Sequence, residues 1–143
     1  MPHFEVYHPP PITMEALHRA GGVPAGWKFT PPPGDPARGR QAFVDFGCFS
    51  CHPVQSEHFA DRPDEQRPGP DLTGMGSHHP TEYFAESILN PDAVLVDGPG
   101  YLGSDGRSIM PSYPDMTLAQ LADLVAYLKS STAAEIKGTC MPR

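Results

Sequence analysis

The sequence predicts a mostly α-helical fold with long loops. Three segments, residues 35–46, 80–89 and 116–130, repeat apolar side chains at the spacing of an amphipathic helix. No segment of useful length alternates apolar and polar residues as a strand would. The 19 prolines and 14 glycines among 143 residues place much of the remaining chain in turns and loops.

Residues 1–34 are predicted to form a Pro-rich N-terminal arm. They contain eight prolines, including two runs of three, and such runs favour extended backbone over helix. Within the arm, residues 12–22 can form a short helix that ends at a pair of glycines. The folded domain is expected to span residues 35–131, followed by a C-terminal tail over residues 132–143.

The helix predicted over residues 35–46 has clear signals at both ends. Asp35 can cap it, Pro36 suits its first turn, and Gly47 can end it. One face carries a glycine and three larger apolar residues: Gly39, Ala42, Phe43 and Phe46. This face is suited to close contact with another helix.

Two further helices are predicted nearer the C-terminus, over residues 80–89 and 116–130. The second has the stronger signals, because Thr117 and Gln120 are spaced as a capping box. Its apolar face is expected to consist of Leu118, Leu121, Leu124, Val125 and Leu128.

The charge of the chain excludes several classes of partner. Its formal net charge is −7 at pH 7, which would repel nucleic acids and anionic lipid surfaces. No apolar stretch approaches the roughly 20 residues of a membrane-spanning helix. We therefore expect no nucleic-acid partner and no membrane span. The first residues also lack the pattern of a secretory signal, so an exported protein would have this chain as its mature form.

Residues 47–54 read GCFSCHPV and place an imidazole directly after the second of two closely spaced thiols. A thioredoxin-like pair would lie between a strand and a helix, and a zinc site would need further soft ligands, of which only the distant Cys140 remains. A disulfide would give His52 no role. In c-type haem attachment both thiols add to haem vinyl groups and the imidazole binds iron. The sequence therefore predicts one covalent haem c bound by Cys48, Cys51 and His52.

The second axial ligand of the iron is expected to be Met110. It lies in the irregular segment SIMPSYPD just before the last helix, where Pro111 would stiffen the backbone. Met116 can instead pack beside the capping box, and Met75 follows the attachment segment closely. These two methionines and the histidines remain open as alternatives.

From residue 35 to residue 130 the sequence resembles the class I cytochromes c, which are small single-haem electron carriers. The resemblance rests on GDPARGRQAF, CFSCH, GPDLTG, IMPSY and LADLVAYL. It implies a small cytochrome c-like helical fold wrapped around one covalently bound haem. It also implies that the first helix crosses the last through Gly39 and Phe43.

The resemblance further assigns roles to the GPDL segment and a location to the protein. Pro70 would offer its carbonyl to the free ring nitrogen of His52, fixing the imidazole, and Leu72 would pack on the haem. Bacterial members of the family mature outside the cytoplasm. A periplasmic or otherwise extracytoplasmic location is therefore expected.

The predicted ligands indicate a function. An iron bound by both His52 and Met110 has no open position for a substrate, and the thioether raises the reduction potential. We therefore expect a single-electron carrier or an electron-transfer subunit of a larger oxidoreductase, not an enzyme in its own right. The alternative is a haem enzyme or gas-binding sensor with a displaceable or absent methionine. Redox proteins are the expected partners, as electron donor and acceptor, and the negative charge favours a basic docking surface on them.

Several other residues have less specific interpretations. His78 and His79 could bind a metal, but such a pair before a helix is more often a solvated loop. Arg62 and Arg67 could pair with the haem propionates, because guanidinium groups suit carboxylates. Cys140 is expected to be a free thiol near the terminus.

Overall fold

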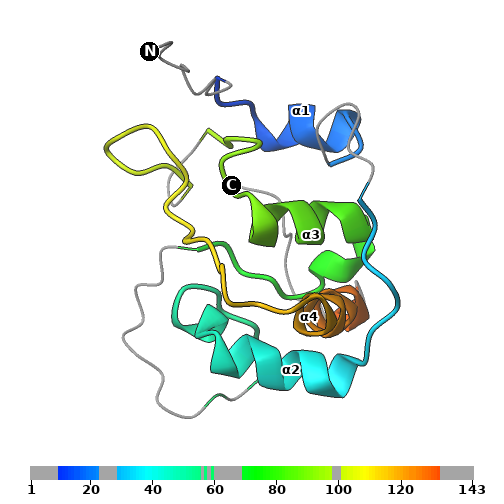
Figure 1. The fold of residues 1–143 in the computed structure, drawn as a ribbon. Coiled ribbons are helices and arrows are strands. Elements are labelled where there is room, and N and C mark those ends of the chain that lie inside the picture. The colour runs from blue at the N-terminus through cyan, green and yellow to red at the C-terminus, as the bar shows by residue number, and fades with distance from the viewer. Residues whose placement is uncertain are drawn as a thin grey trace, which may run out of the picture.

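The computed structural model describes residues 10–22, 29–55, 57, 59, 69–97 and 101–132. Helix α1 (Met14–Arg19) lies over α3 (Thr81–Leu89), and α4 (Leu118–Ser130) passes between α3 and α2 (Pro36–Asp45) (Figure 1). Because α4 is seen end-on while its neighbours lie across the view, it crosses both of them. Short 3₁₀ turns at Cys48–Ser50 and Met75–Ser77 complete the helical structure of the described part.

β-Structure is almost absent from the described residues. It is limited to two isolated bridges, Ile12 with Val96 and Leu102 with Ser108. The mostly α-helical fold predicted from the sequence is therefore confirmed. None of the described helices is long and apolar enough to cross a membrane.

Helix α2 begins and ends where its sequence signals predict. The Asp35 carboxylate accepts hydrogen bonds from the backbone N–H groups of Ala37 and Arg38, at 2.8 and 3.0 Å, and Pro36 occupies the first turn. Gly47 then adopts a left-handed conformation with φ 69°, which costs a glycine little. This reversal directs the following residues back toward the protein interior.

The crossing of α2 and α4 is centred on Gly39, as the family resemblance implied. A Cβ atom at Gly39 would overlap the backbone carbonyl of Asp123. Next to it, the rings of Phe43 and Tyr127 meet edge to face with centroids 5.5 Å apart. Asp123 also accepts hydrogen bonds from the Arg38 guanidinium at 2.9 Å and from the backbone of Asp35 at 2.7 Å. The two helices are thus joined by close backbone approach and by a charge-assisted contact.

Helix α4 has the predicted capping box but not the full predicted apolar face. The Thr117 hydroxyl accepts from the Gln120 N–H at 3.1 Å, and the Gln120 side chain accepts from the Thr117 N–H at 2.9 Å. Leu118, however, is 55% exposed. Burial of α4 begins only at Leu121, because the first turn lies outside the contacts with the neighbouring helices.

Part of the predicted N-terminal arm packs against the rest of the protein. Helix α1 forms within the expected 12–22 segment, with Thr13 as its cap. Ile12 exchanges backbone hydrogen bonds with the 95–97 segment, at 2.7 and 2.8 Å. Met14 and Leu17 are buried against Val96 in a second apolar cluster.

Replacing Gly39 should strongly destabilise the protein. We expect Gly39→Ala to cost about 3 kcal/mol or more, because the added methyl group must separate two backbones. The matched control is Gly106→Ala, where φ is +76° but no atom lies within 4 Å of the new Cβ, so about 1 to 2 kcal/mol of backbone strain is expected. Urea denaturation of the haem-loaded protein measures both, and equal losses would contradict the close crossing.

Candidate haem-binding site

The structure brings all six predicted site residues together around one cavity. The cavity has a volume of about 150 Å³ and opens to the surface. Its lining includes Cys48, Cys51, His52, Pro70, Leu72 and Met110. These residues come from three separate stretches of the chain.

The other walls of the cavity are mainly apolar. Helix α3 and the segment after it supply most of them, and α1 contributes Leu17. The apolar lining side chains are Leu17, Tyr83, Phe84, Ile88, Val94, Leu95, Val96, Tyr101 and Leu128. Such walls keep water away from a flat apolar group such as a porphyrin. The sequence places Leu17 with Met14 on one side of the helix predicted within residues 12–22, but it does not indicate that this side faces the cavity.

The two thiols and the imidazole are arranged by a compact turn at the end of α2. The backbone carbonyl of Cys48 accepts hydrogen bonds from the N–H groups of Cys51 and His52, at 3.2 and 2.9 Å. The Ser50 hydroxyl donates to the Gly47 carbonyl at 2.6 Å. Both thiols are free, with Cys48 buried and Cys51 half-buried. All three side chains consequently line the same cavity.

His52 is held in one orientation by the segment that follows it in space. Its Nδ1 lies 2.9 Å from the Pro70 carbonyl oxygen, the contact that the family resemblance implied. A Cβ on Gly69 would lie only 2.7 Å from the imidazole ring, so glycine permits this close approach. Burial lowers the pKa of His52, against the opposing effect of the Pro70 carbonyl. A neutral ring that donates from Nδ1 leaves Nε2 as a ligand for a metal.

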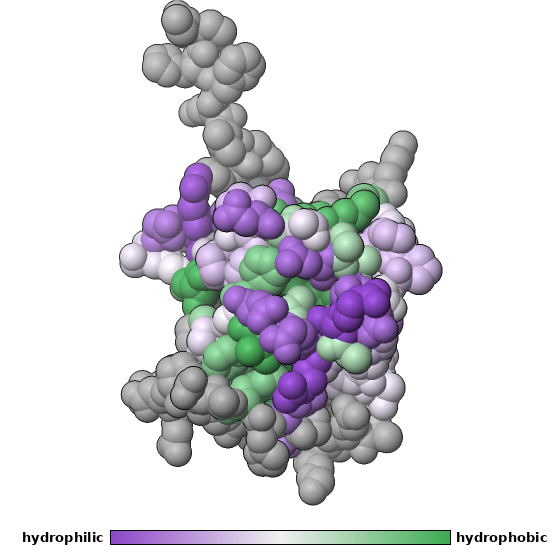
Figure 2. Space-filling view, turned by 60° about the horizontal axis from the view of Figure 1, so that its bottom comes forward, coloured by the Kyte–Doolittle hydropathy of each residue, from purple (hydrophilic) through white to green (hydrophobic). Residues whose placement is uncertain are grey.

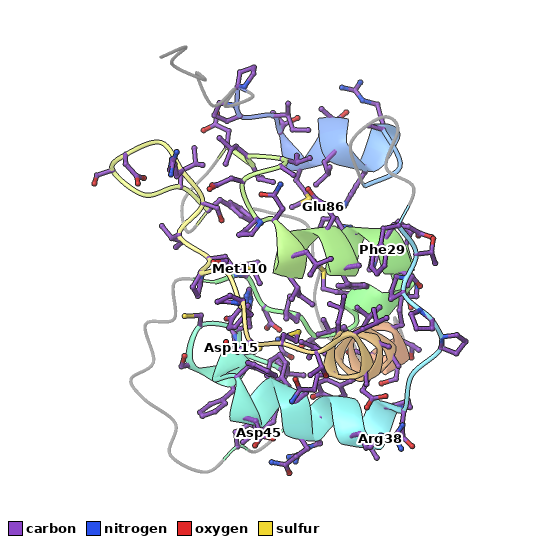
Figure 3. The ribbon with its side chains drawn as sticks, in the orientation of Figure 1. Phe29, Arg38, Asp45, Glu86, Met110 and Asp115 are labelled. Carbon is purple, nitrogen blue, oxygen red and sulfur yellow. The ribbon has the colours of Figure 1, made fainter. Side chains whose placement is uncertain are left out.

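The loop before α4 carries Met110 into the same cavity. Its backbone N–H donates to the Ser108 hydroxyl at 3.2 Å, and the Ser108 N–H donates to the Asp92 carboxylate at 2.8 Å. Figure 3 shows Met110 beside the end of α3, above the turn that follows α2. Of the alternatives, Met75 is buried in the apolar core and Met116 is half-buried against it, and neither lines the cavity.

The environment of Cys48 argues against a thioredoxin-like redox pair. Burial raises the pKa of its thiol to about 11, despite a hydrogen bond from Tyr113. Reactive redox thiols have lowered pKa values instead. Within the described ranges, no group of three or more His, Cys, Asp or Glu side chains is placed to hold a metal ion.

Glu86 is a cavity residue that sequence analysis did not find. It lies on the side of α3 that faces α1 (Figure 3), is 3% exposed, and has one carboxylate oxygen without a hydrogen-bond partner. Burial raises its pKa from 4.5 to about 7. No local signal indicated this, because burial of Glu86 depends on the helix packed over it.

The prediction of a solvated loop at His78 and His79 is wrong for one of the two. His78 is exposed, but His79 is 3% exposed and stacks on Tyr83 with ring centroids 3.7 Å apart. The 3₁₀ turn at Met75–Ser77 turns the chain inward immediately before α3. Arg62, Arg67 and Cys140 lie outside the described residues.

The family model described as cytochrome c matches residues 36–132 of the chain. The chain belongs to this family. The protein therefore carries covalently bound haem c, as predicted, and is a class I c-type cytochrome. The site fits that group, since two free thiols, an oriented imidazole and a methionine line one mainly apolar cavity.

Two individual relatives were also found for this cytochrome c. It is 32% identical over 101 residues to cytochrome c oxidase subunit 2 of Alkalihalophilus pseudofirmus, covering 68% of this chain and 26% of that protein. The chain thus spans about a quarter of that relative's length. The crystal structure of SoxXA from P. pantotrophus aligns with a TM-score of 0.49 and 20% identity, over 78% of this chain and 90% of that chain.

Glu86 should make the stability of the cytochrome depend on pH. Its pKa is higher in the folded protein, so its protonated form favours folding below pH 4.5, and this contribution is lost as pH rises toward 7. Glu86→Gln should therefore match the wild type near pH 4 and exceed it by roughly 2 to 3 kcal/mol at pH 8. Urea denaturation across this range measures the difference, with Glu15→Gln on the exposed face of α1 as the surface control. A constant difference across pH would contradict the assignment.

Proposed function

We propose that this cytochrome c is a single-electron carrier, or the electron-transfer subunit of a larger oxidoreductase. Cys48 and Cys51 hold the haem through thioether bonds, and His52 and Met110 are the axial ligands of its iron. The observation that carries this proposal is that one cavity is lined by both His52 and Met110, whereas neither Met75 nor Met116 lines it. When bound, the haem supplies an iron that alternates between the ferric and ferrous states.

The residues around the ligands favour electron transfer over substrate chemistry. The hydrogen bond from His52 to Pro70 fixes the ring and raises its basicity as a ligand. A thioether ligand from Met110 favours the ferrous state and occupies the position that a substrate or a gas would need. With both ligands in place, only electrons need to enter and leave the site.

The surface near Met110 suits brief contact with a redox partner. Ile109 and Pro111 on either side of it are exposed, and neither is charged. Figure 2 shows hydrophobic side chains in the lower left of the face in view, next to hydrophilic ones. Asp45 and Asp115 are exposed carboxylates, and Asp115 lies nearer to Met110 than Asp45 does (Figure 3). The proposal therefore includes protein partners with a basic docking surface.

The location follows from the same chemistry. Haem attachment to a Cys-x-x-Cys-His motif occurs outside the cytoplasm in bacterial members of the family that the chain resembles. We accordingly place the protein in the periplasm or another extracytoplasmic compartment.

The ligand assignment predicts a distinct spectrum. The ferric protein should show the weak long-wavelength methionine-to-iron charge-transfer band, and Met110→Ala should abolish it and lower the reduction potential, because a thioether ligand favours ferrous iron. Met116→Ala, which changes a methionine outside the cavity, should leave the band intact. A wild-type protein without the band that readily binds carbon monoxide would indicate the enzyme or gas-sensor alternative instead.

The exposed carboxylates of Asp45 and Asp115 should steer charged reactants. Oxidation of the ferrous protein by a cationic cobalt(III) complex should slow as salt is added, whereas oxidation by ferricyanide should accelerate, because salt screens the net negative charge. At low salt, the double variant Asp45→Asn with Asp115→Asn should reduce the ratio of the cobalt(III) oxidation rate to the ferricyanide oxidation rate by about two- to tenfold. The control is Glu15→Gln, which changes an exposed residue of α1, on the far side of α3 from α2 (Figure 1). Stopped-flow rate constants that do not change with ionic strength would contradict electrostatic steering at this surface.

A further inference from the structure

We propose that His18 and His79 form a second metal site, which binds a divalent late transition-metal ion such as Zn²⁺ or Cu²⁺ and joins α1 to the start of α3. The site is separate from the haem cavity and independent of the proposed electron-transfer function. It involves one residue from the predicted N-terminal arm and one from the cytochrome c domain.

The first observation is a set of buried ring nitrogens without hydrogen-bond partners. His79 is 3% exposed, and neither its Nδ1 nor its Nε2 has a partner. The Nε2 of His18 is also buried and has none. Buried polar atoms in native proteins are nearly always satisfied by the chain, by water or by an ion. Three such nitrogens on two neighbouring rings indicate a shared ligand.

The second observation is the spacing of the two rings. Their centroids are 4.8 Å apart, with an interplanar angle of 60°. Two imidazoles bound to one tetrahedral zinc ion through nitrogens about 2.0–2.1 Å from the metal would have ring centres roughly 5 Å apart. The observed centroid separation is close to that value.

The third observation is a surface cavity at which these rings meet. It is lined by His18, Gly21, Gly22, His78, His79 and Pro80, where the end of α1 lies over the start of α3 (Figure 1). In the described part of the chain no third acidic, thiol or imidazole side chain completes a metal-binding set. Water from this cavity would fill the remaining coordination positions, so we expect micromolar rather than tighter affinity.

Both candidate donors are imidazole nitrogens, and the nearby cation is Lys129. Lys129 opposes a second cation, but its ammonium group is directed to the backbone carbonyls of Gly76 and His79, at 2.7 and 2.8 Å. Imidazole ligands suit zinc, copper and nickel.

A metal here would hold α1 to the body of the protein. The turn after α1 already lies close to α3, since a Cβ on Gly22 would be 3.2 Å from the Pro80 side chain. An ion bound only in the folded state stabilises that state by mass action. Added metal should accordingly raise the melting temperature of the haem-loaded protein.

The test uses the full-length haem-loaded chain, treated with EDTA, in a Cys140→Ser background that removes a competing thiol. Calorimetric titration with ZnCl₂ should show one equivalent bound with micromolar affinity. His18→Ala and His79→Phe should each weaken this binding at least tenfold, and the phenylalanine retains the stacking on Tyr83. Glu15→Gln, which removes an exposed carboxylate of α1 that does not line this cavity, should change the affinity less than threefold.

Copper provides a second measurement that does not depend on how well a variant folds. In the ferrous protein, whose low-spin haem is silent in electron paramagnetic resonance, one equivalent of Cu²⁺ should show coupling to two imidazole nitrogens. His18→Ala should lose one of them. Zinc binding that is unchanged in both His18→Ala and His79→Phe, or no binding at 1 mM ZnCl₂, would overturn the proposal and indicate that water alone occupies the site.

Discussion

The close approach of α2 and α4 at Gly39 is the constraint on which the haem site depends. The turn that carries Cys48, Cys51 and His52 follows directly from the end of α2, and the loop that carries Met110 leads directly into α4. The crossing therefore sets how far apart the two predicted ligands lie. Because the contact is between backbones, with Asp123 hydrogen-bonded across it, the helices have little freedom to slide or to separate.

Helix α3 forms a wall of the cavity. Two unusual buried groups lie on this helix or just before it. Glu86 and His79 are both 3% exposed, and both have side-chain atoms without hydrogen-bond partners. Burial shifts their pKa values in opposite directions, upward for the acid and downward for the base, because it disfavours the charged form of each. At pH 7 the Glu86 carboxyl beside the haem cavity is therefore close to half ionised, and the His79 imidazole outside that cavity is neutral.

Features of the fold that depend on residues close together in the sequence could be predicted, whereas features that depend on contacts between distant segments could not. The caps at Asp35 and Thr117 act within one helical turn, so the sequence showed them directly. The haem motif likewise depends on residues only a few positions apart. The burial of Glu86 and His79 depends on α1 packing across α3, and no local pattern indicates which segments meet. Leu118 was assigned to the core for the same reason, since periodicity identifies a face but not how far the neighbouring helix extends.

The position of Leu17 in the cavity wall has a consequence for how such a protein can change during evolution. Leu17 belongs to a segment that precedes the family match at residues 36–132, yet it lines the same cavity as the haem-binding motif. The dielectric environment of a haem is one determinant of its reduction potential. Substitutions in this N-terminal segment could therefore adjust the redox properties while leaving the attachment motif and both axial ligands unchanged. The N-terminal segment can therefore influence the reduction potential although it lies outside the residues that attach the haem.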